Sequence, residues 1–213
     1  MKTIFGYDPG GNGGHGVAAL TVDDSYKPTK IVVQTQETVK DVINWFSQFK
    51  DPTGIGIDTL TKWATGKSGW RPADLWLRKQ YPDVALSVSS PNSLYSSMTV
   101  GGMVVKSWFF NQYPNALISE THPKVLYFAL KKQKHDWVNT SKEMMDFHSE
   151  KLGIFCELRC EQPNDHEFDS AISCYAVLEY LRGNLKRDLH VMPFDDRCAI
   201  YIEPYGNSIY AWP

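Results

Sequence analysis

The order of β-rich and helical segments is the feature that most restricts the fold of this chain. Three β-rich segments come first, at residues 3–7, 17–21 and 30–34, and a glycine-rich turn at residues 8–14 joins the first two. Strands joined by short turns pair antiparallel. Helical and β-rich segments alternate further along, which favours parallel pairing. We therefore expect an α/β fold whose sheet has three antiparallel strands followed by parallel strands.

Helix start signals and short apolar runs predict the remaining elements. Thr38 begins a capping box, and apolar residues then recur at helical spacing. Further helices are expected after Pro72, from residue 140 to about 152, and from Asn164 or Asp165 to Gly183. Strands are expected at residues 54–58, 84–88 and 116–119, with a closing hairpin formed by residues 200–202 and 209–211.

Length and composition favour one globular domain. The chain has 213 residues, of which 42% are hydrophobic, and shows no linker, so residues 1–213 are expected to form a single domain with a loop or helical insertion around 59–113. No long apolar run is present, and the opening residues lead into a strand. We therefore expect a cytoplasmic protein without a membrane partner.

The net charge restricts which partners the chain can bind, and the spacing of its cysteines indicates the redox state of its thiols. A net charge of −2 gives no broad basic surface for tight, sequence-independent binding of nucleic acid. It does not exclude a metal-dependent nuclease, because bound cations would neutralise substrate phosphates. The four cysteines, at positions 156, 160, 174 and 198, lack the second pair of a zinc site, which predicts reduced thiols.

Three predicted strands end in a carboxylate. Asp8, Asp58 and Glu120 each follow a β-rich run directly. One acid at a strand end is common, because Asp also opens turns. The carboxyl ends of parallel strands line one crevice, so these three acids are expected to converge there.

A fourth acid lies in the last long helix. Asp169 shares a helical stripe with Ile172 and Ala176, the face that should meet the sheet, and Asp165 lies one turn earlier. Acids four residues apart repel, and a hard cation such as Mg²⁺ or Mn²⁺ would relieve that repulsion. The alternative is that Asp165 is only the N-cap and Asp169 a half-exposed acid of the first turn.

Two of these segments carry a resemblance to a known family. Residues 6–14, Gly-Tyr-Asp-Pro-Gly-Gly-Asn-Gly-Gly, resemble the first strand and turn of RuvC-type resolvases, and residues 165–171 resemble their acidic final helix. The segments at 56–59, 71–74 and 119–124 are similar to a broad family of uncharacterised predicted RNase H-like nucleases. The resemblance extends over nearly the whole chain, in order.

The resemblance implies an RNase H-like mixed sheet with helices on both faces. It also implies that Asp8 bridges two Mg²⁺ or Mn²⁺ ions, that Asp58 and Glu120 each hold one, and that Asp169 completes the site with Asp165 or His166 assisting. Two metals about 3.5–4 Å apart can activate water and stabilise the leaving oxygen of a phosphoryl displacement.

Residues that would contact a substrate lie in the loop between positions 59 and 71. Lys62, Lys67 and Arg71 with Trp63 and Trp70 combine cations and aromatic rings suited to phosphates and stacked bases. The alternative is that the tryptophans only pack the domain. His15, His122 and His166 each neighbour a predicted acid, so one of them is expected to orient water or move a proton.

The sequence thus favours metal-dependent hydrolysis of phosphodiester bonds in DNA or RNA. The competing hypothesis is a non-catalytic binding or assembly module that kept the fold. A phosphotransferase of the actin and hexokinase type would need a duplicated domain, for which 213 residues leave no room. The nature of the nucleic acid and the oligomeric state stay open, a dimer included.

Overall fold

The computed structural model describes residues 1–11, 14–64, 69–136, 139–154, 156–158, 164–193, 201–203 and 206–213. In these ranges the strands are β1 (Lys2–Asp8), β2 (His15–Val22), β3 (Pro28–Gln36), β4 (Pro52–Ile57), β5 (Trp63–Ala64), β6 (Leu117–Glu120), β7 (Cys156–Leu158), β8 (Arg187–Asp188), β9 (Tyr201–Ile202) and β10 (Ile209–Trp212). The α-helices are α1 (Val39–Phe46), α2 (Pro72–Gln80), α3 (Ser96–Gln112), α4 (Pro123–Lys131), α5 (Thr140–Phe147) and α6 (Asp165–Leu181).

One mixed sheet organises the described part of the chain. Its strand order is β7-β3-β2-β1-β4-β6-β10-β8. Strand β2 runs antiparallel to both β1 and β3, whereas β4 is parallel to β1 and β6 is parallel to β4. The expected α/β class, with antiparallel strands followed by parallel ones, is confirmed.

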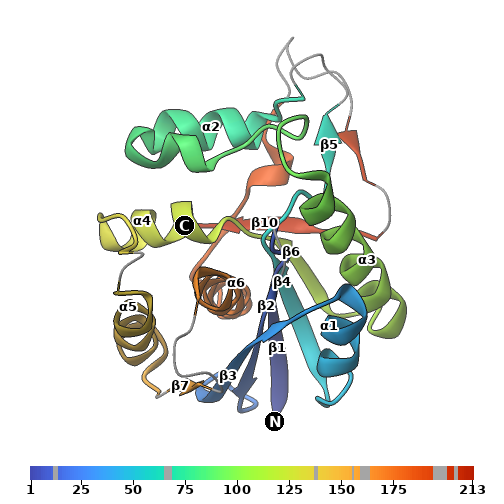
Figure 1. Ribbon diagram of the computed structural model, residues 1–213, viewed down its shortest axis with the longest axis vertical. Coiled ribbons are helices and arrows are strands. Elements are labelled where there is room, and N and C mark those ends of the chain that lie inside the picture. The colour runs from blue at the N-terminus through green and yellow to red at the C-terminus, as the bar shows by residue number, and fades with distance from the viewer. Residues whose placement is uncertain are drawn as a thin grey trace.

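Helices cover both faces of this sheet (Figure 1). Successive side chains of a strand point to opposite faces. In β1, Ile4 therefore joins the hydrophobic cluster beneath α6, while its neighbour Phe5 joins the cluster beneath α1 and α3. Helix α6 packs across β1, β2 and β4, and it is buried along nearly its whole length.

Capping residues explain where the principal helices begin. The Thr38 side chain accepts from the backbone N–H of Asp41, as predicted for the start of α1. Asn164 is the N-cap of α6, and its side chain accepts from the Glu167 N–H. Asp165 is therefore the first helical residue and not the cap.

Some predicted elements are wrong. Residues 82–87 form a 3₁₀-helix, η1, where a strand was expected, because Pro82 starts a turn and a short apolar run has no period of its own. The closing segments do not form a hairpin: β9 pairs with β5, and β10 lies parallel to β6. Residue 200 lies outside the described residues. Helix α4 was not predicted. The helix predicted from residue 140 to about 152 is confirmed, although its last turn, η3 (His148–Leu152), is π-helical.

Candidate metal centre

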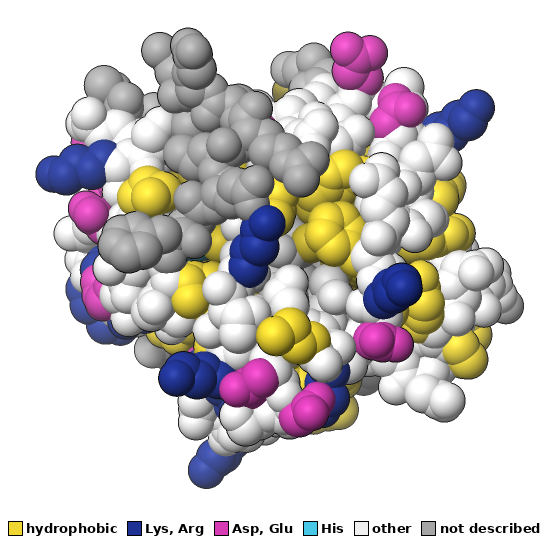
Figure 2. Space-filling model, turned by 90° about the horizontal axis from the view of Figure 1, so that it is seen from below, with side chains coloured by type: hydrophobic (Ala, Val, Ile, Leu, Met, Phe, Trp, Pro, Cys, Tyr) yellow, Lys and Arg dark blue, Asp and Glu magenta, His cyan; other side chains and the backbone are white. Residues whose placement is uncertain are grey.

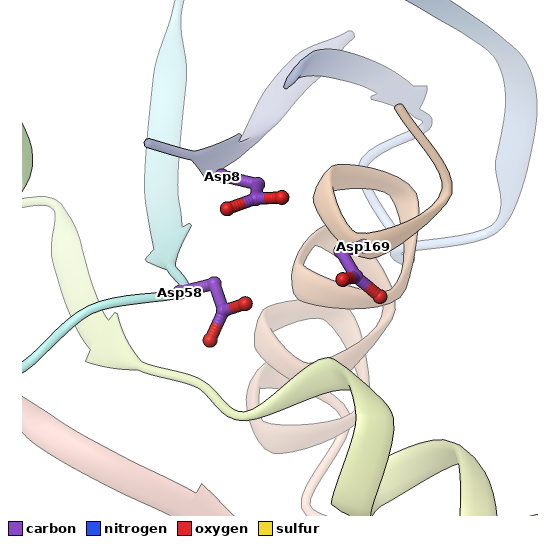
Figure 3. Close-up of side chains that lie close together, drawn as sticks. All are labelled: Asp8, Asp58 and Asp169. Carbon is purple, nitrogen blue, oxygen red and sulfur yellow. The ribbon is translucent and has the colours of Figure 1, made fainter. Parts of the chain in front are cut away.

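Three aspartates meet at the carboxyl edge of the sheet. Asp8 ends β1, Asp58 follows β4, and Asp169 lies in α6 (Figure 3). A carboxylate oxygen from each lies within 4.8 Å of the other two. The parallel register that pairs Tyr7 with Ile57 places the first two side by side. The structure therefore brings together three of the acids that the sequence singled out.

Glycines in the strands let α6 approach closely enough to add the third aspartate. A Cβ atom on Gly6 would lie 1.8 Å from the carbonyl oxygen of Ser170, and one on Gly56 would lie 2.4 Å from that of Ser173. These distances are far below van der Waals contact, so only glycine fits. The helix backbone rests directly on β1 and β4, which carries Asp169 to the strand ends.

The cluster concentrates negative charge in a buried place. The side chains of Asp8 and Asp169 are almost wholly buried, so the half-exposed alternative for Asp169 is wrong. Burial raises the pKa of Asp58 well above its usual range, and the charges of Asp8 and Asp169 raise it further. Burial likewise raises the pKa of Asp169 to about 7, with Asp8 adding to the shift and Lys124 opposing it.

Two carboxylate oxygens without a hydrogen bond indicate that the cluster suits a cation. Oδ1 of Asp8 and Oδ2 of Asp169 are buried, and within the described ranges neither accepts a hydrogen bond. A buried carboxylate oxygen without a donor is costly. Hard divalent cations prefer oxygen ligands of this type. The residues present therefore fit Mg²⁺ or Mn²⁺.

His166 orients Asp8 rather than joining the acid cluster. Its Nδ1 donates to Oδ2 of Asp8 over 2.6 Å. This hydrogen bond raises the pKa of His166, against the opposing effect of burial. Asp165 also stays outside the cluster, and its carboxylate lies 3.9 Å from Nζ of Lys124. His166 thus contacts the cluster through a hydrogen bond to Asp8.

Lys124 was not predicted as a site residue. Its Nζ lies 3.6 Å from Oδ2 of Asp169. Burial alone would lower the pKa of Lys124, but Asp169 and Asp58 raise it overall, so the side chain stays a cation. Pro123 marks the first turn of α4 directly after the end of β6, and this signal could have placed Lys124 at the strand ends.

Glu120 does not join the three aspartates. Its Oε1 accepts from Nη2 of Arg71 at 2.6 Å, and its Oε2 accepts from Nη1 at 2.8 Å and from the Thr61 N–H at 2.7 Å. Burial opposes ionisation, but Arg71 and His190 hold the pKa of Glu120 far below its usual range. The expectation that Glu120 ligates a metal is corrected, because both of its oxygens already accept hydrogen bonds from the buried guanidinium of Arg71.

The predicted substrate contacts also take structural partners. Arg71 is 1% exposed, and its Nη2 donates to Asp74 and to Glu120. Lys62 pairs with Glu203, with 3.2 Å between Nζ and Oε2. Trp70 packs against the larger core cluster and under Arg78. Arg71 cannot reach a phosphate without breaking its hydrogen bonds to Asp74 and Glu120. Trp70 packs against the domain, which agrees with the alternative considered for the tryptophans.

The other singled-out residues are placed as follows. His15 begins β2, and its Nδ1 is 3.0 Å from the Tyr7 hydroxyl, whereas His122 lines a cavity near the aspartates that is described below. Cys174 is a buried free thiol. Lys67, Cys160 and Cys198 lie outside the described residues, and the Cys156 side chain is not described.

A small cavity opens over the aspartates. It has a volume of about 220 Å³ and is lined by Asp8, Asp58, Lys124, His166, Gly11, Tyr95 and Met98. Asp8, Asp58 and Lys124 are therefore reachable from outside the core. A ligand entering the cavity would meet carboxylates and a cation together.

Fold and site define an α/β protein with a buried aspartate cluster at the carboxyl edge of a mixed sheet. Comparison with known proteins finds no matching family model, no matching curated protein and no matching solved structure. Among the described residues, no helix combines the length and the apolar character needed to cross a bilayer.

Proposed function

We propose that this chain is a divalent-metal-dependent nuclease of RNase H-like fold that hydrolyses phosphodiester bonds in DNA or RNA. The observation that carries the proposal is the set of three aspartate oxygens within 4.8 Å of one another, supplied by two adjacent parallel strands and the helix that crosses them. Rigid elements hold such ligands in the fixed geometry that metal-assisted displacement requires.

The strand directions support the proposal. The resemblance to RuvC-type resolvases and predicted RNase H-like nucleases implies three antiparallel strands followed by parallel ones, with acids on the first strand, a later strand and the final helix. Strands β1, β2 and β3 pair antiparallel, and β4 and β6 continue the sheet in parallel. Asp8, Asp58 and Asp169 are compatible with these three places, whereas Glu120, which the resemblance also implies as a ligand, is bonded to Arg71.

Each polar residue of the site has a distinct part in the proposed reaction. Asp8, Asp58 and Asp169 would hold Mg²⁺ or Mn²⁺, which supplies an activated water and charge neutralisation at the phosphate. His166 fixes Asp8 through the hydrogen bond to Oδ2. Lys124 brings a cation beside Asp169, from where it can hold a phosphate oxygen and stabilise the charge that develops there.

The distribution of charge fits a site that depends on metal rather than on a basic surface. Figure 2 shows the face of the molecule seen from below, and on its described part Lys and Arg side chains lie scattered among Asp and Glu and form no single basic patch. The net charge is −2. Affinity for phosphates would then come from cations at the aspartates, and binding is expected to weaken sharply when the metal is removed.

The test is cleavage of labelled single-stranded, duplex and branched DNA and RNA in Mg²⁺, in Mn²⁺ and in EDTA. We expect cleavage of at least one substrate that requires the metal. Calorimetric titration of the protein with Mn²⁺ should show binding in the millimolar range or tighter. Metal binding without cleavage of any substrate would favour the non-catalytic binding module, and the absence of both would reject a metal site.

A further inference from the structure

A second cavity adjoins the aspartate cluster. It has a volume of about 220 Å³ and lies among the end of β4, the start of α2, residues 87–98 and the start of α4. Asp58, Tyr95, Met98 and Lys124 line both this cavity and the one over the aspartates. A ligand at the aspartates could therefore extend into the second cavity.

The walls of the second cavity suit a flat, apolar ring. Val88, Leu94 and Met98 contribute aliphatic surface, and Tyr95 lines both cavities. Tyr95 is 64% exposed, and among the described residues no aromatic ring stacks on it, so its ring is open to a ligand. The volume is below the roughly 300–1,000 Å³ typical of drug-sized ligands, so the cavity takes one small ring system.

His122 supplies a polar contact inside this cavity. Its Nδ1 is buried and has no hydrogen-bond partner among the described residues, while the ring bonds to the backbone of Ser87. Burial, and the neighbouring charge of Lys124, lower the pKa of His122 to about 4. The neutral ring uses its one N–H on the Ser87 carbonyl, which leaves Nδ1 as an acceptor for an N–H donor.

The charges that line the cavity exclude a phosphate. Asp58, Asp74 and Glu120 are acidic, and the guanidinium of Arg71 is already engaged by two of them. An anion in this cavity would be repelled by these carboxylates. Lys124, which also lines the cavity over the aspartates, is the other basic side chain of the lining. A neutral ring that offers an N–H donor meets no such penalty.

We propose that the second cavity binds one unpaired nucleobase of the strand whose phosphate lies at the aspartates. This inference rests on the proposed nuclease function and specifies its substrate. A base in a duplex reaches such a pocket only after it leaves the stack, at a cost of a few kcal/mol. Single-stranded or branched nucleic acid is therefore the preferred substrate over continuous duplex.

The first test removes one base at a time. The cleavage position is mapped on a single-stranded oligonucleotide in Mn²⁺, and rates are then compared for oligonucleotides with an abasic site at each nearby position. We expect one position, next to the scissile phosphate, at which loss of the base slows the wild type about tenfold, the order of effect of one stacked base. Equal rates at every position would overturn the pocket while leaving the nuclease proposal standing.

Two variants connect that effect to the cavity. Leu94→Trp narrows the pocket, and His122→Phe keeps a ring while removing the acceptor; each should slow cleavage of the intact oligonucleotide and abolish the contrast with the abasic one. Val104→Trp, at a position 45% exposed on α3, is the matched control and should behave as the wild type. Melting temperatures of all variants separate misfolding from loss of binding.

A binding measurement decides the matter independently of cleavage. Oligonucleotides with single 2-aminopurine substitutions are titrated with the wild type in Ca²⁺, and a fluorescence rise at one position would report a base removed from its stack. A rise without cleavage in Mn²⁺ would reject the nuclease and retain a base-binding site. The absence of a rise at every position would reject the base pocket.

Discussion

Nδ1 of His166 donates to Oδ2 of Asp8 across 2.6 Å, and this contact joins the end of the first strand to the first turn of the last long helix. It holds one oxygen of Asp8, while Oδ1 stays buried without a partner in the described ranges. The histidine thereby fixes the orientation of an acid that the cluster needs, in the way that outer contacts orient metal ligands.

Replacing Asp8 by Asn should abolish metal-dependent hydrolysis and leave the fold intact or slightly more stable. The amide keeps the shape of the side chain but removes a charge that repels Asp58 and Asp169 in the metal-free protein. Cleavage assays of both proteins with Mg²⁺ or Mn²⁺ would measure the activity. Thermal melts of both proteins in EDTA would measure the stability of the metal-free state. Cleavage that survives in Asp8→Asn would exclude Asp8 from the mechanism.

Mg²⁺ or Mn²⁺ should raise the melting temperature, because a ligand that binds only the native state stabilises it by mass action. At a concentration 100 times the Kd the gain is about 2.7 kcal/mol. Asp169→Asn should lose most of this gain. Asp165→Asn, one helical turn away and outside the cluster, is the matched control and should retain it.

Metal affinity should fall as the pH falls through neutrality. The pKa of Asp169 is raised to about 7 by burial and by Asp8, so protons compete with the cation below that pH. Calorimetry at pH 8 and pH 6 should show weaker binding and greater proton release at pH 6. Equal affinity at both pH values would contradict the raised pKa.

His148 should make the protein less stable in mild acid. It is fully buried, and burial lowers its pKa from 6.5 to about 4. Between these values the unfolded chain binds more protons than the native one, so the free energy of unfolding should fall by roughly 3 kcal/mol as the pH drops from 7 to 4. His148→Phe should lose this dependence.

Denaturant unfolding of the wild type and His148→Phe across that pH range would measure the difference. Comparing the two proteins cancels the opposite contribution of Asp58 and Asp169, whose raised pKa values favour the native state at low pH. Stability curves that stay parallel would show that His148 does not titrate as expected.

Gly6→Ala should destabilise the fold by about 2 kcal/mol or more, as overpacked cores do. The added methyl group would lie 1.8 Å from the Ser170 carbonyl oxygen, so α6 must move away from β1. Because α6 carries Asp169, metal binding should weaken as well. Gly101→Ala, whose methyl group would lie 3.3 Å from the end of the Tyr7 side chain, should be nearly neutral by comparison.

Local sequence pattern was sufficient for the central strands and for the acids at their ends. β1, β2, β3 and β4 lie where alternation and turn residues predict them, and Thr38 caps α1 as expected. The parallel strand ends then place Asp8 beside Asp58 without further information. The buried stripe of α6 likewise follows from its helical period, which made Asp169 recognisable.

Tertiary structure alone decided which other polar residues belong to the site. Glu120 lies at the carboxyl end of a parallel strand, as Asp58 does, yet its oxygens accept hydrogen bonds from Arg71, 49 residues away in the chain. Lys124 approaches the aspartates from the first turn of α4, a helix that was not predicted. The reason is that a buried charge is paired by side chains that lie far away in the sequence. The periods that predict strands and helices depend only on residues that are close together in the sequence.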